Sequence, residues 1–206
     1  MKGLLLKDFY TTKANILVAL LSCLVMAIGL SFVISPSVVI ILVAIPLSMT
    51  VSGTIISDKK NKWTQYSVTL PVSKKQIISS KYIAYLFWVI VGLIVGTLIC
   101  LVVLKITNTT DNYMNIFIGF SIIISLLSGS IIMPCNFVLP EEQSIIGTIL
   151  AYSLTSGILA LSIFGLNQIF NVRENMNITL VICSIISAVI YIISWIVSSQ
   201  KIKNFN

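Results

Sequence analysis

Ionisable side chains are scarce in this sequence of 206 residues, and histidine is absent. Only 9% of the residues are charged, while 57% are hydrophobic. A water-soluble domain carries about 25% charged residues, so this composition leaves too little polar surface to cover a globule in water. The four cysteines have no metal-ligand spacing, and we interpret them as small apolar packing residues.

Long runs without any charged residue divide the chain into membrane spans. Five such runs occur, at 14–57, 82–104, 112–140, 143–172 and 175–200. A helix needs about 20 apolar residues to cross a hydrocarbon core about 30 Å thick. The first run holds two crossings, divided at Ser35-Pro36-Ser37, and the predicted spans are 15–34, 38–57, 82–104, 115–137, 145–167 and 178–198. The sequence therefore predicts an all-α membrane protein of six transmembrane helices, with 1–206 as a single transmembrane domain.

The positive charges are distributed unequally between the two sides of these spans. Eleven of the thirteen Lys and Arg residues fall on one side, and only Lys105 and Arg173 fall on the other. Positively charged residues next to span ends are retained in the cytoplasm. We therefore expect both termini and the loop between spans 2 and 3 to be cytoplasmic. The net charge of +7 then reflects topology and contact with anionic lipids, and does not indicate nucleic-acid binding.

Several kinds of active site are missing from the sequence. The predicted spans contain no ionisable group of the kind that proton- and ion-coupled carriers use. No P-loop motif occurs, so we expect no ATP hydrolysis by the chain itself. The pair Glu141-Glu142 suggests an intramembrane protease of the prenyl-protein type, but such enzymes also need histidine. We therefore predict that the chain is not an enzyme and holds no metal or cofactor.

The first thirteen residues, 1–13, have the pattern of an interfacial helix. Leu5, Leu6, Phe9 and Tyr10 can face lipid, while Lys7, Asp8 and Thr11 can face water. We predict an amphipathic helix lying in the membrane interface before span 1. The alternative interpretation is a positively charged flank without a structure of its own.

The cytoplasmic loop at 58–81 is expected to be ordered. The residue before a proline is pushed out of helical geometry, so the first part of the loop should end at Leu70-Pro71. Ser73 and Gln76 then form a capping box, with Val72 and Ile77 as its hydrophobic staple. We predict a second helix that begins at Ser73 and continues into span 3. An ordered loop without a domain of its own suggests a docking surface.

Three further groups of residues have both a structural and a functional interpretation. Glu141 and Glu142 fit the first turn of span 5, where the helix dipole favours them, or a contact with a basic partner. Gly92 and Gly96 form a G-x-x-x-G that permits close helix packing. The hydroxyls of spans 2 and 4 either bond neighbouring helices or line a substrate path: Thr50, Ser52, Thr54, Ser121, Ser125 and Ser128.

The long loop contains Asp58, Trp63, Thr69 to Ile77 and Ser80-Lys81-Tyr82, the N-terminus reads MKGLLLKDFY, and Pro134 and Phe137 form a P-x-x-F motif. Together these residues resemble the signature of small bacterial ABC-exporter permeases of the type-2 class. Within that class the chain is similar to the phenol-soluble modulin exporter permeases of staphylococci. Leu139-Pro140 departs from the charged, glycine-bearing turn that usually follows.

This resemblance implies a permease in the bacterial plasma membrane that exports amphipathic peptides or other hydrophobic or antimicrobial compounds. Its partners would be two ATP-binding subunits, which bind ATP and Mg, and a second permease, identical or different. The ATPase docking residues would be Trp63, Leu70, Pro71, Val72, Ser73, Lys74, Lys75, Gln76, Glu141 and Glu142. A stand-alone secondary transporter and a non-transporting immunity or sensor module are the alternatives.

Overall fold

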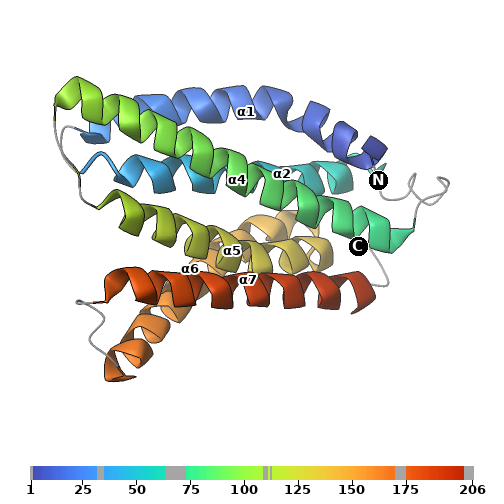
Figure 1. Cartoon of the computed structure of the whole chain (residues 1–206). Coiled ribbons are helices and arrows are strands. Elements are labelled where there is room, and N and C mark those ends of the chain that lie inside the picture. Colours follow the sequence, from blue (N-terminus) through green and yellow to red (C-terminus); the bar gives the residue numbers. More distant parts are fainter. Residues whose placement is uncertain are drawn as a thin grey trace.

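The computed structural model describes residues 2–31, 35–63, 73–108, 111, 113–169 and 175–201. Six helices and no strand occur within these residues (Figure 1). They are α1 (Lys2–Ser31), α2 (Val38–Lys60), α4 (Lys74–Thr107), α5 (Met114–Val138), α6 (Glu141–Ile169) and α7 (Met176–Lys201). The prediction of an all-helical chain is therefore confirmed over the described residues.

Five of these helices, α2 and α4 to α7, are long and apolar enough to cross a membrane. Their bounds enclose five of the predicted spans to within a few residues. α1 includes residues 15–31 of the remaining predicted span, 15–34, whose last three residues lie outside the described set, and it runs unbroken from Lys2 to Ser31. Residues 2–13 are therefore the first turns of one long helix, not a separate one, and their placement in the membrane interface stays a prediction.

Successive helices run in opposite directions, so one end of every helix lies at the side of the bundle that is on the right in Figure 1. α1, α4 and α6 begin there, and α2, α5 and α7 end there. We call this the lysine-rich end, because Lys59, Lys74, Lys75 and Lys81 lie on it. α2 is central and contacts α1, α4, α5 and α6.

α2 and α4 pack closely because small residues line the contact. A Cβ atom added to Gly92 would lie 2.8 Å from the Cα of Ala44, and one added to Gly96 would lie 3.0 Å from the Cα of Ile40. Carbon atoms at their van der Waals optimum are about 3.5–4.0 Å apart, so neither glycine has room for a side chain. The G-x-x-x-G of α4 thus packs within the chain, against α2.

α7 attaches to α4 through aromatic rings and hydroxyl groups. The Tyr82 hydroxyl lies 3.1 Å from the hydroxyl of Ser194 and 2.9 Å from that of Ser198. Tyr191 donates to the backbone carbonyl of Tyr82 at 2.9 Å, and the Trp195 ring stacks on the Tyr82 ring. These bonds satisfy hydroxyl groups away from water, where an unpaired polar group is costly.

A proline inside α5 provides a further contact with α7. Pro134 has no N–H, so it cannot donate to the carbonyl of Ser130 one turn earlier. The Ser194 hydroxyl of α7 donates to that carbonyl at 2.6 Å. Neighbouring serine side chains commonly satisfy backbone groups that a proline frees in membrane helices.

At the opposite end of the bundle, Asp111 accepts hydrogen bonds at the N-terminus of α2. Its carboxylate accepts hydrogen bonds from the Ser37 hydroxyl at 2.7 Å, the Ser37 N–H at 3.2 Å and the Tyr113 N–H at 2.9 Å. Burial works to raise the pKa of Asp111, but these hydrogen bonds outweigh it and hold that pKa below its ordinary value. The carboxylate also lies where the positive end of the α2 dipole favours an anion.

Large apolar side chains cover the outside of the described helices. On α6 they include Ile145, Ile149, Leu154, Leu161 and Phe164, each more than half exposed. Such continuous apolar exposure is unstable in water and fits hydrocarbon or a neighbouring subunit. Together with the five long apolar helices, it shows a multi-pass membrane protein.

The contact between α2 and α4 gives a first prediction. Replacing Gly92 by Ala should lower the free energy of unfolding by about 1–3 kcal/mol, because the new Cβ would overlap the Ala44 backbone. The matched control is Gly53→Ala on α2, where nothing lies within 4 Å of an added Cβ. Unfolding in SDS-containing mixed micelles measures both variants. Equal stability of the two variants would show that the helices are farther apart than in this structure.

Candidate functional site

Four charged side chains meet at the lysine-rich end, where α1, α2 and α4 come together. Lys81 of α4 lies 2.6 Å from Asp8 of α1 and 2.8 Å from Asp58 of α2. Lys7 of α1 pairs with Asp58 and lies 3.9 Å from Asp8. We call Lys7, Asp8, Asp58 and Lys81 the charge cluster. It is electrically balanced, with two cations and two anions.

Three of the four side chains of the charge cluster are nearly closed to solvent, while that of Lys7 is 28% exposed. Asp8 is 4% exposed, Asp58 7% and Lys81 3%. An ammonium group has three donors, and the Lys81 Nζ has three oxygen atoms within 2.9 Å, from Asp8, Asp58 and the Thr54 hydroxyl. The buried ammonium is therefore fully satisfied. A buried pair of this kind is strongly destabilised when one partner is removed.

The prediction that Lys7 and Asp8 face water is wrong for Asp8. The carboxylate turns into the bundle because Lys81, 73 residues away, lies opposite it. Burial raises the pKa of Asp8, and the charge of Lys81 opposes that shift. Burial likewise lowers the pKa of Lys7, and the hydrogen bond with Asp58 opposes it. In each group the counter-charge favours the ionised form, whereas burial disfavours it.

Trp63, a predicted docking residue, contacts the charge cluster. The Lys7 ammonium lies 3.6 Å from the centre of a Trp63 ring, which is a cation–π contact. The side chain is partly buried and lines a narrow cleft with Lys59, Lys81 and Phe137. Trp63 therefore attaches the chain just after α2 to α1.

The start of α4 confirms the predicted capping box. The Ser73 hydroxyl accepts from the Gln76 N–H at 3.3 Å, and the Gln76 side chain accepts from the Ser73 N–H at 3.1 Å. Lys74 and Lys75 follow in the first turn, with exposed side chains. The other predicted docking residues of this loop, Leu70, Pro71 and Val72, lie outside the described residues.

The short loop between α5 and α6 is attached to α2 by Lys59. The Lys59 ammonium donates to the backbone carbonyl of Leu139 and lies 3.4 Å from the backbone carbonyl of Phe137. These carbonyls end α5, where the helix dipole favours a cation. α6 begins directly afterwards at Glu141, so Glu142 lies in its first turn, as predicted, with an exposed side chain. The side chain of Glu141 lies outside the described set.

The three serines of the predicted path lie together on a buried face of α5. Ser121, Ser125 and Ser128 are each 0% exposed. Tyr85 of α4 donates to the Ser125 carbonyl at 2.8 Å and lies 3.4 Å from the Ser128 hydroxyl. The two threonines of that path have other contacts. Thr54 accepts from Lys81, and Thr50 donates to the Leu47 carbonyl of its own helix.

Several buried polar atoms around this face have no hydrogen-bond partner among the described residues. They are the hydroxyls of Ser52, Ser121 and Ser125 and the side-chain amide of Asn136. Buried polar groups are normally hydrogen-bonded. We call these residues, with Ser128, the polar seam. Its residues lie on α2 and α5, which contact each other.

Sequence reasoning missed the roles of Asp8, Asp58, Lys59 and Lys81. A signal was present, because Asp8 and Asp58 are isolated carboxylates at the ends of apolar helices, among lysines of the same side. The partner of each lies on another helix, and no local pattern identifies it. In the described part of the chain, no group of three His, Cys, Asp or Glu side chains is placed to hold a metal.

One comparison with known proteins gives a match. The family model described as ABC-2 family transporter protein matches residues 3–203, which is nearly the whole chain. No curated protein and no solved structure matches significantly.

The charge cluster gives a second prediction. Lys81→Met should lower the free energy of unfolding by about 3–5 kcal/mol, because two buried carboxylates lose their shared cation. Asp8→Asn should lower the free energy of unfolding less in the Lys81→Met variant than in the wild type. The coupling energy between the two substitutions should be about 1–3 kcal/mol. The same micelle titration measures all variants, and Lys75→Met on the exposed first turn is the control. Strict additivity of the two changes would contradict the buried pair.

Proposed function

The chain belongs to the ABC-2 family of transporter proteins, and from this premise we propose that it is the permease subunit of an ATP-driven exporter. Two separate ATPase subunits would bind ATP and Mg and supply the energy, and a second permease, identical or different, would complete the transporter. The chain itself would carry out no catalysis. The main support for the proposal is that one helix, α4, contains both an exposed, capped first turn and Lys81 of the buried charge cluster.

The length of α4 supports a docking role for its first turns. Its 34 residues extend over about 51 Å, whereas the hydrocarbon core is only about 30 Å thick. Lys74 and Lys75 would therefore lie outside the hydrocarbon core on the lysine-rich end. The helix dipole disfavours cations in the first turn of a helix. We therefore infer that these lysines bind acidic groups on an ATPase subunit.

The charge cluster supports transmission from this docking site to the spans. Lys81 lies about 12 Å along α4 from the Ser73 cap, on the same unbroken helix. Through Asp8 and Asp58 it holds α1 and α2. A push on the first turn of α4 would thus move three helices as one body, which is the behaviour that a switching transition requires.

The charge distribution supports the orientation of this transporter in the membrane. We propose that the lysine-rich end faces the cytoplasm of a bacterial cell, with both termini on that side. α1 would then provide the sixth span, with its first turns in the interface. Leu6, Phe9 and Tyr10 fit that position, because they are 59%, 46% and 65% exposed.

The polar seam supports a route for cargo. Its hydroxyl and amide groups without a partner among the described residues carry no fixed charge, so they suit uncharged or amphipathic molecules better than small ions. We propose amphipathic peptides or similar hydrophobic compounds as the cargo. Transport would require the seam to open, and the unpaired groups favour opening because water or cargo would supply the hydrogen bonds that the closed form lacks.

The docking proposal is tested with the intact chain in its native membrane. An affinity-tagged chain should co-purify with an ABC ATPase under gentle detergent. The double variant Lys74→Glu, Lys75→Glu should abolish the permease-dependent stimulation of ATP hydrolysis, because acidic groups on the partner would meet like charges. Its insertion and thermal stability should match the wild type, since both side chains are exposed.

The matched control for that experiment is Lys105→Glu, on the opposite side of the bundle from the docking turn. It should leave the stimulation unchanged. Recovery of no ATPase with the wild type, or full ATP-driven transport by the double variant, would contradict the proposed coupling.

The cargo route gives a separate prediction. Ser121→Ala and Ser125→Ala remove hydroxyls that make no hydrogen bond among the described residues, so thermal stability should be unchanged or slightly higher. Efflux of an amphipathic peptide from loaded vesicles should fall. Ser153→Ala, an exposed serine on α6 that bonds its own helix, is the control. Loss of stability with normal efflux would make these serines structural only.

A further inference from the structure

Two neighbouring residues at the end of α2 contact different parts of the bundle. Asp58 pairs with Lys7 of α1 and with Lys81 of α4. Lys59 donates instead to the Leu139 carbonyl, in the turn between α5 and α6. Adjacent residues of a helix do not face the same side, so the two side chains join α2 to different partners. The end of α2 therefore links the charge cluster to the α5–α6 turn.

The cation at the end of α5 comes from another helix. The last turn of α5 contains no basic residue, although the helix dipole favours a cation there. Lys59 of α2 supplies this charge, with its ammonium against the Leu139 carbonyl and 3.4 Å from the Phe137 carbonyl. Hydrogen bonds from an ionised donor are stronger than those between neutral groups. The position of α2 thus fixes the end of α5.

The α5–α6 turn that Lys59 holds is closely packed. The Leu139 N–H donates to the Cys135 carbonyl of α5 at 2.8 Å. A Cβ atom added to Gly147 of α6 would lie 2.7 Å from the Leu139 side chain, so this side chain packs directly on the second turn of α6. A displacement of Leu139 would therefore be passed on to the start of α6.

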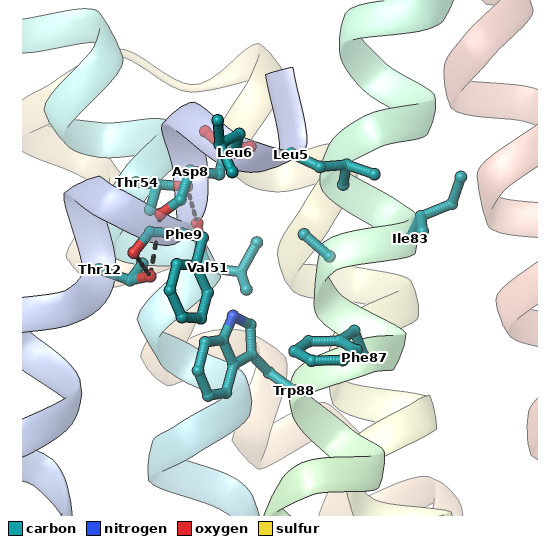
Figure 2. A pocket seen from close by; sticks show the side chains of 11 residues that line it. Leu5, Leu6, Asp8, Phe9, Thr12, Val51, Thr54, Ile83, Phe87 and Trp88 are labelled. Atoms are coloured by element: carbon teal, nitrogen blue, oxygen red, sulfur yellow. Dashed lines mark hydrogen bonds between the residues drawn. The ribbon is translucent and has the colours of Figure 1, made fainter. Parts of the chain in front are cut away.

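Close packing borders the charge cluster on the α5 side but not on the α1 side. Phe137 of α5 is 3% exposed and lines a cleft of only about 10 Å³ together with Asp58, Lys59 and Lys81. Asp8, by contrast, borders a cavity of about 370 Å³ that lies between α1 and α4 (Figure 2). Close-packed side chains and hydrogen bonds transmit strain. The contact between α2 and α5 is therefore the stiffer path out of the charge cluster.

We propose that Lys59 is a positioning residue for transport, through which movement of α1, α2 and α4 reaches α5 and α6. The proposal rests on the proposed exporter function, in which docking displaces the first turn of α4. Lys81 passes this displacement to Asp58, and Lys59, the next residue of α2, passes it to the α5–α6 turn. Because most of the polar seam lies on α5, this link connects ATP hydrolysis to the opening of the seam.

Hydrogen–deuterium exchange of the full-length chain in lipid nanodiscs tests the contact itself. Lys59→Met keeps the length of the side chain but removes its donors, so amide exchange from Leu139 to Gly147 should become at least fivefold faster. The loss of a hydrogen bond from a charged group corresponds to about a tenfold change or more. Lys59→Arg keeps donors and should exchange like the wild type. Lys60→Met, at the exposed neighbouring residue, is the control and should also match the wild type.

Transport by the permease together with its co-purified ATPase tests the positioning role. The measurement is ATP-driven uptake of a fluorescent amphipathic peptide of leucine and lysine into inside-out vesicles. Lys59→Met should still stimulate ATP hydrolysis, since Lys74 and Lys75 are unchanged, but should move at least fivefold less peptide per ATP. Lys59→Arg should restore the ratio of peptide to ATP. A merely structural defect would lower uptake and ATP hydrolysis together and leave this ratio unchanged.

The two measurements separate failure of this proposal from failure of the exporter function. Unchanged exchange in Lys59→Met, an unchanged ratio of peptide to ATP, or no recovery of the ratio in Lys59→Arg would each overturn the positioning role. Absence of ATP-driven uptake with the wild type would instead overturn the exporter function, and the role of Lys59 in transport with it.

Discussion

A charged group that leaves water for the interior of a membrane protein must keep a counter-charge close to it. Lys81 meets this constraint by lying between Asp8 and Asp58, each on a different helix. The position of α4 therefore fixes the ends of α1 and α2 at the same time. The position of Trp63 is fixed by the same cluster, because Lys7, which pairs with Asp58, also lies against the Trp63 ring.

Close packing continues the alignment that the charges begin. Beyond the charge cluster, Gly92 and Gly96 bring the backbone of α4 against that of α2. In a bilayer, lipid tails are as apolar as leucine, so helices gain their attraction from such close contact and from hydrogen bonds. α7 is held by hydrogen bonds. The Ser194 hydroxyl of α7 lies next to the Tyr82 hydroxyl and donates to the backbone carbonyl that Pro134 leaves without its helical partner.

The helices and one cap could be predicted from the sequence, because both depend on local patterns. Run length identifies an apolar helix, and the capping box of Ser73 and Gln76 spans only four residues. The charge cluster could not be predicted in this way. Its partners are separated by as many as 73 residues, and helical periodicity alone placed Asp8 on the water-facing side. The shared face of Ser121, Ser125 and Ser128 was visible in the sequence, but it did not show that two of their hydroxyls lack a partner among the described residues.

The geometry of a carboxylate explains how one residue can serve two sites. An ionised carboxylate has two oxygens with about four acceptor positions, more than one or two ammonium groups occupy. In Asp58 both oxygens are used, one by Lys7 and the other by Lys81. In Asp8 both cations approach the same oxygen, Oδ1, and Oδ2 has no hydrogen-bond partner among the described residues. Asp58 therefore bridges Lys7 and Lys81 through separate oxygens, whereas Asp8 holds Lys81, and through it α4, with one oxygen.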